Sequence, residues 1–432
     1  MGLVTHVFDE EALAGLHGDI AIGHTRYSTT GSTQLFNAQP FIAEGNLGQI
    51  ALCHNGNIVN AEALQQELRD SGLTFTSSTD SEVIAAAIAH GPGATWLEKI
   101  RTTMRRVSGA YSLALLTKDS LIAVRDPLGI RPLCLGKLRR GWVVASETCA
   151  LDHLGAQFLR EVEPGEVLVI NKSGVSSYRM EAPEGDEAAR RAFCIFEFIY
   201  FARPDSVMNG RLLYMTRERM GQRLADEHPV EADVVIGTPD SAIPAAIGYA
   251  RQSGIPYSEG LIKNRYVGRT FIQPSQEIRE AGVRLKFNPL PEVLQGKRVV
   301  VVDDSIVRGT TTPRVVGLLR RAGAKEIHLR ISSPPIQHPC FFGVDMATKG
   351  ELIAAHKSVE EIRRYIGADS LGYLSLDGLT WAIDVPGRQF CTACLTGEYP
   401  VPVQLELDKL ALESVWARDP LRQSGVVGDR QR

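Results

Sequence analysis

The stretch Arg298–Thr312 constrains the fold of this chain more than any other. Four consecutive valines, Val299–Val302, predict a strand that is buried on both faces, as in a parallel sheet. Asp303 and Asp304 stand at its carboxyl end, and a loop of hydroxyls and glycine leads to Thr312 as the expected helix cap, followed by Pro313. In open α/β sheets, ligands bind at the carboxyl ends of strands, near helix N-termini. The pattern therefore predicts a sugar-phosphate site.

The same stretch indicates the chemistry of the ligand. Free backbone N–H groups, hydroxyls and the helix dipole favour a phosphate monoester at the loop. The acidic pair suits ribose hydroxyls or a Mg²⁺ ion, which prefers oxygen ligands. The chain contains no Gly-Lys-Ser/Thr sequence, so this is not a Walker loop. The alternative is a buried strand with two helix-capping aspartates, but capping explains neither the second acid nor the run of hydroxyls.

Two more segments of the C-terminal half suggest anion binding. A strand predicted at Ala232–Ile236 leads into the loop Gly237–Ser241 and a helix, which makes a second possible anion cradle. An ordinary turn whose last serine caps the helix is the alternative. Further on, cations alternate with glycine and proline from Lys263 to Lys286, which predicts a loop that closes over an anion and excludes water. A solvated basic loop is the competing interpretation.

The N-terminal half has a different pattern. Short apolar segments alternate with polar turns and few helices separate them, which predicts an antiparallel α+β layer domain. A polar linker at Glu181–Arg191 divides this half from the rest of the chain. The predicted strands are Ile20–Tyr27, Ile50–His54, Tyr111–Thr117, Ser120–Arg125, Gly141–Ser146 and Glu166–Asn171, and the predicted helices are Ala61–Gly72 and Ser81–His90.

Composition limits the classes of function. With 44% hydrophobic and 22% charged residues, the chain can bury substantial cores. A net charge of -3 and the lack of a basic run argue against nucleic-acid binding, and no apolar stretch is long enough to span a membrane. Seven cysteines with one Cys-x-x-Cys pair indicate a reducing compartment, which we expect to be the cytoplasm, and a metal rather than disulfides.

Three polar clusters stand out in the N-terminal half: Gly23–Tyr27, His54–Asn57 and Thr79–Glu82. Each is a weak signal by itself, because an Asn-Gly pair more often marks a hairpin than a catalytic element. Together and in this order, they resemble the glutaminase domain of class II (N-terminal-nucleophile) glutamine amidotransferases. The resemblance implies a fold in which antiparallel sheets lie between helices.

The resemblance also implies roles for single residues. Arg26 would bind the glutamine α-carboxylate, a task that suits the forked guanidinium, and Asp80 would bind the α-amino group. The Asn55 side chain and the Gly56 backbone N–H would form the oxyanion hole, where negative charge grows during amide cleavage.

One element of that family is missing from this sequence. The family uses an N-terminal cysteine whose own α-amine is the general base, whereas this chain begins Met1-Gly2. Cys53 cannot replace it by pairing with His54, because neighbours on a strand point to opposite faces; a small buried residue is its expected role. We therefore expect an N-terminally truncated first domain that does not hydrolyse glutamine, and a reaction that depends on added ammonia.

The C-terminal motifs resemble type I phosphoribosyltransferases, which bind 5-phosphoribosyl-1-pyrophosphate (PRPP) on a parallel sheet. With the basic loop included, they resemble specifically the glutamine PRPP amidotransferases, or amidophosphoribosyltransferase family. The resemblance implies that Ser241, Asp303 and Asp304 hold Mg²⁺ and that the two aspartates also bind substrate. Lys263 and Arg265 would neutralise the departing pyrophosphate. The other implied substrate-binding residues are Thr238, Asp240, Lys286, Ser305, Arg308, Gly309, Thr310 and Thr311.

In that family, ammonia from glutamine crosses an internal channel and attacks C1 of PRPP, so that pyrophosphate leaves and 5-phosphoribosylamine forms, the first step of purine (IMP) synthesis. The resemblance implies this reaction, purine nucleotides as feedback inhibitors, and a homo-oligomer, either a tetramer or a dimer. The expected domains are residues 1–183 (truncated amidotransferase), 193–398 (phosphoribosyltransferase with a cluster-binding part) and 399–432 (C-terminal extension).

Two other classes of function are open. A non-catalytic PRPP-binding regulator could share the fold, but the intact basic loop and the acidic net charge disfavour a DNA-binding sensor. A glutaminase or a structural relic of an amidotransferase is disfavoured by the missing nucleophile.

The cysteines add a cofactor. Cys391 and Cys394 form the Cys-x-x-Cys pair, and the resemblance supplies Cys194 and Cys340 as partners. These positions match the branch of the family that carries a [4Fe–4S] cluster. Spacing alone would license only a four-cysteine metal site, so zinc is the alternative cofactor.

Overall fold

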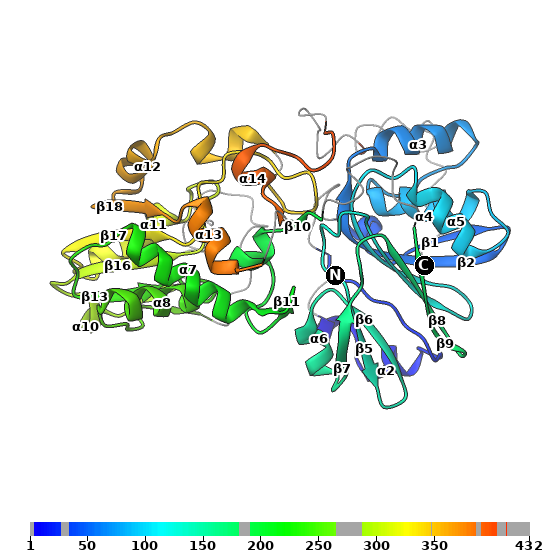
Figure 1. Cartoon of the computed structure of the whole chain (residues 1–432), viewed down its shortest axis with the longest axis horizontal. Coiled ribbons are helices and arrows are strands. Elements are labelled where there is room, and N and C mark those ends of the chain that lie inside the picture. The colour runs from blue at the N-terminus through cyan, green and yellow to red at the C-terminus, as the bar shows by residue number, and fades with distance from the viewer. Residues whose placement is uncertain are drawn as a thin grey trace.

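A computed structural model describes residues 4–26, 34–180, 191–264, 287–346, 348–385, 390–403 and 412. The chain forms two halves that lie side by side, one built on antiparallel sheets and the other on a parallel sheet (Figure 1). Both predicted classes, antiparallel α+β and parallel α/β, are confirmed. The predicted linker lies almost entirely at residues 181–190, outside the described residues.

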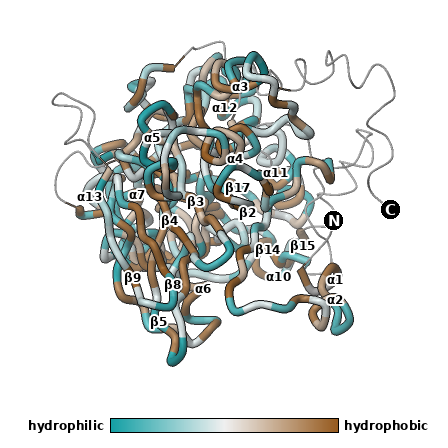
Figure 2. The backbone as a smooth tube through the Cα atoms, turned by 90° about the vertical axis from the view of Figure 1, so that its right-hand side faces the viewer, coloured by the Kyte–Doolittle hydropathy of each residue, from teal (hydrophilic) through white to brown (hydrophobic). Residues whose placement is uncertain are grey.

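A six-stranded antiparallel sheet forms the centre of the first half. Helices α3 (Ala61–Asp70), α4 (Asp80–His90) and α5 (Trp96–Met104) cover one face of it. The strands β4 and β8, near the middle, are markedly hydrophobic (Figure 2). In spatial order the strands are β1 (Phe41–Gly45), β2 (Gly48–Ile58), β3 (Gly109–Leu116), β4 (Leu121–Arg125), β8 (Glu166–Asn171) and β9 (Gly174–Arg179).

A second, three-stranded sheet packs against β4 and β8 through side chains that include Leu133, Leu135 and Val162. Its order is β6 (Gly141–Ala145), β5 (Cys134–Leu138), β7 (Gln157–Glu161), and helix α6 (Thr148–His153) connects β6 to β7. Two short helices, α1 (Val4–Val7) and α2 (Glu10–Ala14), and the 3₁₀ turn Leu35–Asn37 precede these sheets.

The second half is a parallel sheet between two layers of helices. Its order is β13 (Val234–Gly237), β16 (Arg298–Asp303), β17 (Glu326–Ile331), β18 (Ser370–Tyr373). One helical layer contains α7 (Leu213–Glu227), α8 (Ile243–Ser253) and α13 (Leu376–Ile383); the other contains α11 (Thr312–Arg321) and α12 (Val359–Ile366).

The valine strand holds these layers together. In β16, Val300 and Val302 pack in the same core as α7 and α8, whereas Val299 and Val301 pack in the core of α11 and α12. Successive side chains of a strand point to opposite faces, so an unbroken apolar run fits a strand that is covered on both sides. The predicted doubly buried strand is confirmed.

Several short elements surround the parallel sheet. Two-stranded pairs are formed by β10 (Phe193–Cys194) with β19 (Phe390–Cys391), β11 (Val207–Met208) with β12 (Arg211–Leu212), and β14 (Leu261–Lys263) with β15 (Phe287–Pro289). The short helices are the π-helix Glu197–Phe201, α10 (Pro291–Leu294), α14 (Ala393–Thr396) and the 3₁₀ turns Lys349–Glu351 and Ile353–Ala355.

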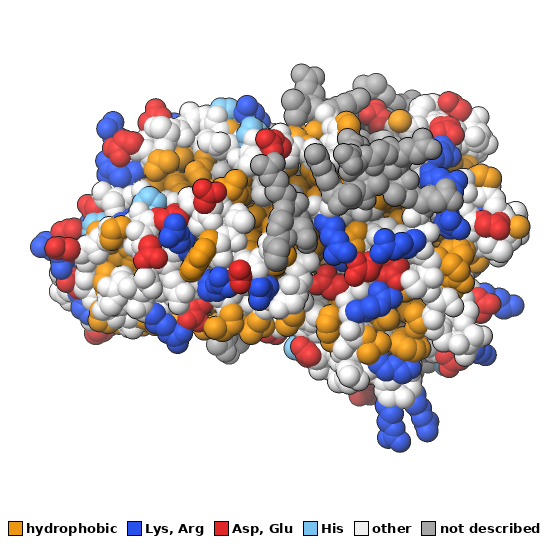
Figure 3. Space-filling model, in the orientation of Figure 1, with side chains coloured by type: hydrophobic (Ala, Val, Ile, Leu, Met, Phe, Trp, Pro, Cys, Tyr) orange, Lys and Arg blue, Asp and Glu red, His pale blue; other side chains and the backbone are white. Residues whose placement is uncertain are grey.

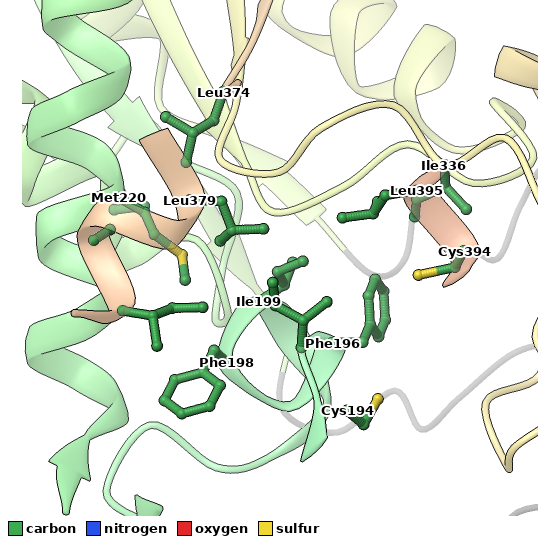
Figure 4. Close-up of a cluster of buried hydrophobic side chains, with 14 of the residues drawn as sticks. Cys194, Phe196, Phe198, Ile199, Met220, Ile336, Leu374, Leu379, Cys394 and Leu395 are labelled. Atoms are coloured by element: carbon green, nitrogen blue, oxygen red, sulfur yellow. The ribbon is translucent and has the colours of Figure 1, made fainter. Parts of the chain in front are cut away.

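Buried apolar side chains join the halves. Ala110 and Ile130 of the first half belong to the same hydrophobic cluster as Phe193 and Phe341 of the second. Figure 4 shows part of this cluster, including Cys194, Phe196, Ile336 and Cys394. Leu412, close to the end of the chain, packs instead in the core of the first half. The position of the two halves is therefore fixed by packing.

Most predicted elements are confirmed within a few residues, with two corrections. The predicted strand at Ile20–Tyr27 is wrong for its described part, because residues 20–26 form no regular element and pair with no strand in the described chain. The apolar residues Ile20 and Ile22 pack on the sheet core from outside the ladder, which explains the misleading alternation. Helix α11 begins at Thr312, so its cap is Thr311, which makes no side-chain capping bond.

On the face shown in Figure 3, acidic and basic side chains lie beside one another over both halves. No helix in the described ranges combines the length and the apolar character needed to cross a bilayer.

Candidate active sites

The carboxyl ends of β13 and β16 bring two predicted loops together. These strands are parallel neighbours in which Gly237 pairs with Val302, and the Thr238 N–H donates to the Val302 carbonyl (2.9 Å). The loop 238–242 therefore lies beside the loop 304–311. Because parallel strands end at the same edge, the two anion cradles predicted from separate parts of the sequence form one site.

Asp304 links these loops. Its Oδ2 accepts a hydrogen bond from the Ser241 hydroxyl (2.5 Å) and its Oδ1 accepts one from the Ser305 hydroxyl (2.6 Å). Its side chain is buried, and burial raises the pKa of Asp304, although the two hydroxyls and Arg217 act in the opposite direction. Asp304 is thus held by protein groups on both oxygens.

Asp303 differs from its neighbour in exposure. It is partly exposed, and its Oδ1 accepts a hydrogen bond from the Asp304 N–H (3.0 Å). The two carboxylates, which look equivalent in the sequence, therefore have different positions: Asp304 faces the protein and Asp303 lies at the accessible edge of the sheet.

The loop 304–311 contains one glycine, Gly309, at a position that only glycine fits. Gly309 has a φ of +67°, and a Cβ at this position would lie 2.6 Å from Cδ1 of Ile353, so only glycine fits without displacing that side chain. Thr310 and Thr311 are exposed at the start of α11, and Arg308 forms an ion pair with Glu351 (3.1 Å). Exposed hydroxyls at a helix N-terminus suit a phosphate.

The basic residue Lys263 reaches the other side of this site. Its ammonium group forms an ion pair with the carboxylate of Asp240, one residue before Ser241. The peptide bond between Pro239 and Asp240 is cis. Thr238 is buried, and its hydroxyl makes no hydrogen bond with any described residue. A buried hydroxyl without a protein partner is a position where a ligand or a bound water can complete the hydrogen bonding.

Two predicted residues of the basic loop, Arg265 and Lys286, lie outside the described residues. The ends of that segment are fixed, because Lys263 pairs with Phe287 between β14 and β15. Both ends of the predicted closing loop therefore lie beside the Asp240–Ser241 turn.

In the first half, Asp80 is the first residue of α4 and is buried. Its Oδ2 accepts a hydrogen bond from the Ile58 N–H (3.0 Å) and lies 3.6 Å from Nδ1 of His54. Ser81 contacts both, at 3.4 Å from Asp80 Oδ1 and 3.2 Å from His54 Nδ1. The second and third predicted clusters therefore meet where β2 reaches the start of α4.

The first predicted cluster lies against the same place. The pKa of His24 falls from 6.5 to about 4, chiefly because the ring is buried and also because His54 and Arg26 lie near it. Arg26 is partly exposed. Cys53 is buried, and burial raises the pKa of its thiol to about 12, so its predicted role as a small buried residue is confirmed.

The two predicted oxyanion-hole residues follow on β2. Gly56 has a φ of +151°, and a Cβ there would lie 2.1 Å from the Ala110 carbonyl oxygen, so the position admits only glycine. The Asn55 Oδ1 accepts a hydrogen bond from Arg131 Nε (3.2 Å), and its Nδ2 donates to the Ser146 hydroxyl (3.3 Å). Arg131 was not found from the sequence, where it stands in an ordinary turn with no motif around it.

The four predicted cluster cysteines converge at the boundary between the halves. Cys194 and Cys391 are directly paired in the parallel strands β10 and β19. The pKa of the Cys394 thiol is raised well above its usual value, first by burial and then by the charges of Cys340, Cys194 and Cys391. No group of three or more His, Cys, Asp or Glu side chains in the described ranges is arranged to hold a single metal ion.

Arg131 lies beside these cysteines. Burial raises the pKa of Cys194 to about 12, and the guanidinium of Arg131 opposes that rise. Arg131 is completely buried, and its Nη1 makes no hydrogen bond with any described residue. Its Nη2 lies 3.0 Å from Oε1 of Glu197, a carboxyl group that is also buried. The Arg131 guanidinium thus lies close to the sulfurs of Cys194 and Cys340, both of which raise its pKa.

Comparisons with known proteins cover both sites. The glutamine amidotransferase domain family matches residues 24–153, and the phosphoribosyl transferase domain family matches residues 208–332. The amidophosphoribosyltransferase of Synechococcus elongatus is 52% identical over 96% of this chain and 85% of that protein. The corresponding figures for the amidophosphoribosyltransferase of Mycobacterium bovis are 51%, 96% and 81%.

Two solved structures are similar over 94% of this chain, each with a TM-score of 0.87 and 50% sequence identity. One is the allosteric regulatory enzyme of purine biosynthesis, matched over 87% of its chain. The other is the glutamine PRPP amidotransferase of B. subtilis in complex with ADP and GMP, matched over 89% of its chain.

Proposed function

This chain belongs to the amidophosphoribosyltransferase family, and from that premise we propose how its residues carry out the family's reaction. The chain is a phosphoribosyltransferase that forms 5-phosphoribosylamine and pyrophosphate from PRPP and ammonia derived from glutamine, in purine biosynthesis. The observation that carries the assignment of the PRPP site is the pair of hydrogen bonds from Ser241 and Ser305 to Asp304, which joins two anion-binding loops at one sheet edge.

The reaction forms a bond between nitrogen and C1 of the ribose, breaks the bond from C1 to pyrophosphate, and releases a proton from the attacking ammonia. In our proposal the loop from Ser305 to Thr311 binds the 5′-phosphate, because its exposed hydroxyls lie at the N-terminus of α11. Asp303 takes the ribose hydroxyls. Thr238 lies on the opposite loop, and Lys263, the last residue of β14, pairs with Asp240 of that loop; we place the charge that develops on the leaving pyrophosphate beside them.

A Mg²⁺ ion fits this edge of the sheet. Of the three residues predicted around it, Ser241 and Asp304 are hydrogen-bonded to each other, and Asp303 is the partly exposed carboxylate. We therefore assign direct binding of the cation to Asp303 and the shaping of its surroundings to Ser241 and Asp304. When bound, the ion would neutralise negative charge on the pyrophosphate.

In the first half, we propose that Arg26 and Asp80 bind glutamine and that Asn55 and Gly56 form the oxyanion hole. The support is their proximity: His24 couples electrostatically to Arg26 and His54, and His54 lies beside Asp80. The use of free ammonia in place of glutamine stays a prediction, which a comparison of the two nitrogen sources decides.

For the cysteine site we propose an iron–sulfur cluster, with zinc as the alternative. A single tetrahedral zinc ion with bonds of about 2.3 Å would need sulfurs about 3.8 Å apart, and metal analysis of the purified protein distinguishes it from iron. A [4Fe–4S] cluster with four thiolates is larger and carries net negative charge, which the buried guanidinium of Arg131 near Cys194 and Cys340 would help to balance. The cluster would supply structural cross-linking that oxygen can destroy.

Four further proposals accompany the family assignment. The B. subtilis relative was solved with ADP and GMP, which supports purine nucleotides as effectors of this chain. Homo-oligomerisation, a cytoplasmic location and the domain boundaries 1–183, 193–398 and 399–432 stay predictions. Within the proposed extension, the Tyr399 hydroxyl donates to the Pro339 carbonyl of the second half, and Leu412 packs in the core of the first half.

The assignment is tested by measuring pyrophosphate release from PRPP with ammonia and, separately, with glutamine. An amidophosphoribosyltransferase releases pyrophosphate in step with phosphoribosylamine when ammonia is present. A non-catalytic regulator, which the family match does not favour, would bind PRPP without releasing pyrophosphate.

A further inference from the structure

The oxyanion-hole segment Asn55–Asn57 is held by the second half of the molecule. The amide Nδ2 of Asn57 donates a hydrogen bond to the Phe341 carbonyl (3.0 Å), a residue 284 positions further along the chain. Gly343 lies directly against Gly56: its φ is +102°, and a Cβ there would lie 3.0 Å from both Cα and the carbonyl carbon of Gly56. Two glycines thus allow the backbones of the two halves to touch.

Arg131 makes a third connection, to the side chain of Asn55. Its Nε donates to Asn55 Oδ1, and its Nη2 lies 3.0 Å from Glu197 of the second half. Its guanidinium also stacks on the ring of Phe201, with 4.6 Å between its central carbon and the ring centroid. A guanidinium can only donate hydrogen bonds, so it fixes the amide oxygen of Asn55 towards itself and leaves the amide NH₂ to face away.

The loop 340–346, which contains Phe341 and Gly343, is held in shape by hydrogen bonds of Cys340, one of the four predicted cluster cysteines. The N–H of Cys340 donates to the Met346 carbonyl (2.9 Å), and the N–H of Phe342 donates to the sulfur of Cys340 (3.4 Å). The apolar side chains between them are buried in the cluster that joins the halves. The shape of the loop 340–346, and with it the position of Gly343, therefore depends on Cys340.

We propose that Arg131 and the loop 340–346 are positioning elements of the glutamine site, so that Asn55 and Gly56 are correctly placed only while the second half is docked and its cysteine site is intact. This inference rests on the proposed oxyanion role of those two residues. Such donors act because they are oriented before the reaction, and small displacements weaken them strongly. Loss of the cysteine site would then disable the first half without any change in its own residues.

Backbone hydrogen–deuterium exchange in the full chain, with its metal site loaded, tests the proposal. Gly343→Ala should raise the exchange rate of peptides that cover residues 53–58 by about tenfold and leave the other strands of the first sheet unchanged. Gly350→Ala is the matched control, because a Cβ at Gly350 meets no atom within 4 Å. Removal of the thiol in Cys340→Ser should produce the same local increase as Gly343→Ala.

The same measurement can overturn the proposal. Equal exchange of residues 53–58 in Gly343→Ala, Cys340→Ser and the control would contradict it, and so would a uniform increase across both halves, which indicates general destabilisation. If Gly343→Ala does not fold, Asn57→Ala, which removes the side-chain bond to Phe341, decides the question in the same way. Ammonia-dependent pyrophosphate release by the unsubstituted chain is measured in parallel: its absence would refute the proposed function, whereas the exchange result stands independently.

Discussion

The two candidate sites differ in how their residues are held. The PRPP site is built at the end of one parallel sheet, where Ser241, Asp304 and Ser305 are joined by hydrogen bonds within the same half. The residues of the proposed glutamine site are contacted from outside their half, through Phe341, Gly343 and the Glu197–Arg131 pair. The site at the edge of the parallel sheet is formed by loops that directly follow strands of that sheet. The site in the first half also has contacts from residues of the second half.

The largest expected effect comes from breaking the buried pair at the boundary. Glu197→Gln leaves the Arg131 guanidinium buried without its carboxylate, which should lower the free energy of unfolding by about 3–5 kcal/mol. Thermal and urea unfolding measure it. The control Glu67→Gln loses only an exposed pair with Arg106 and should unfold close to the parent. Equal stability of Glu197→Gln and this control would show that the halves do not depend on the pair.

Substitution of Asp304 tests the proposed PRPP site in the second half. Asp304→Asn replaces one acceptor oxygen by an NH₂ group, which cannot accept from both hydroxyls, so ammonia-dependent pyrophosphate release should fall about a hundredfold. Asp303→Asn should also reduce turnover strongly. Arg26→Ala should leave ammonia-dependent release unchanged, because it lies in the other half. Equal losses from all three variants would contradict the division of labour.

The free energy of unfolding should depend on pH through His24, a residue of the first half. The pKa of His24 is about 4 in the folded chain and near 6.5 when unfolded, so between these values the unfolded state binds more protons. Protonation therefore destabilises the fold as pH falls, by about 2 kcal/mol between pH 7 and pH 5 for this group. Urea unfolding at the two pH values measures the change, and His24→Gln should reduce it. An identical pH dependence in the variant would show that His24 is not buried in this way.

The smallest effect is expected from the cation beside the pyrophosphate loop. Lys263→Met removes the ion pair with Asp240 and the positive charge near the leaving group, which should slow ammonia-dependent turnover about tenfold. The matched variant Lys172→Met, at an exposed position in the first half, should have parent activity. A Lys263→Met enzyme with unchanged turnover would remove this residue from the proposed mechanism.

Much of the second half could be predicted from the sequence, because its signals are local. The valine run, the acid pair and the hydroxyl loop follow one another in the chain, and the structure keeps them in consecutive elements. The first half was harder to predict. Its apolar alternation at Ile20–Tyr27 suggested a strand, but alternation cannot show whether a partner strand is available, and residues 20–26 pair with none in the described chain.

The residue patterns alone determined the two fold classes, the strand buried on both faces and the residue types that suit a phosphorylated sugar. Tertiary structure alone decided that Asp304 faces inward while Asp303 stays accessible, and that Arg131 and the Cys340 loop support Asn55–Asn57. The physical reason is the distance along the sequence over which each kind of interaction acts. Preferences for strands, loops and helix caps arise between neighbours in the chain. The burial of a side chain and its hydrogen-bond partners are set by segments far apart in the sequence, as for Asn57 and Phe341.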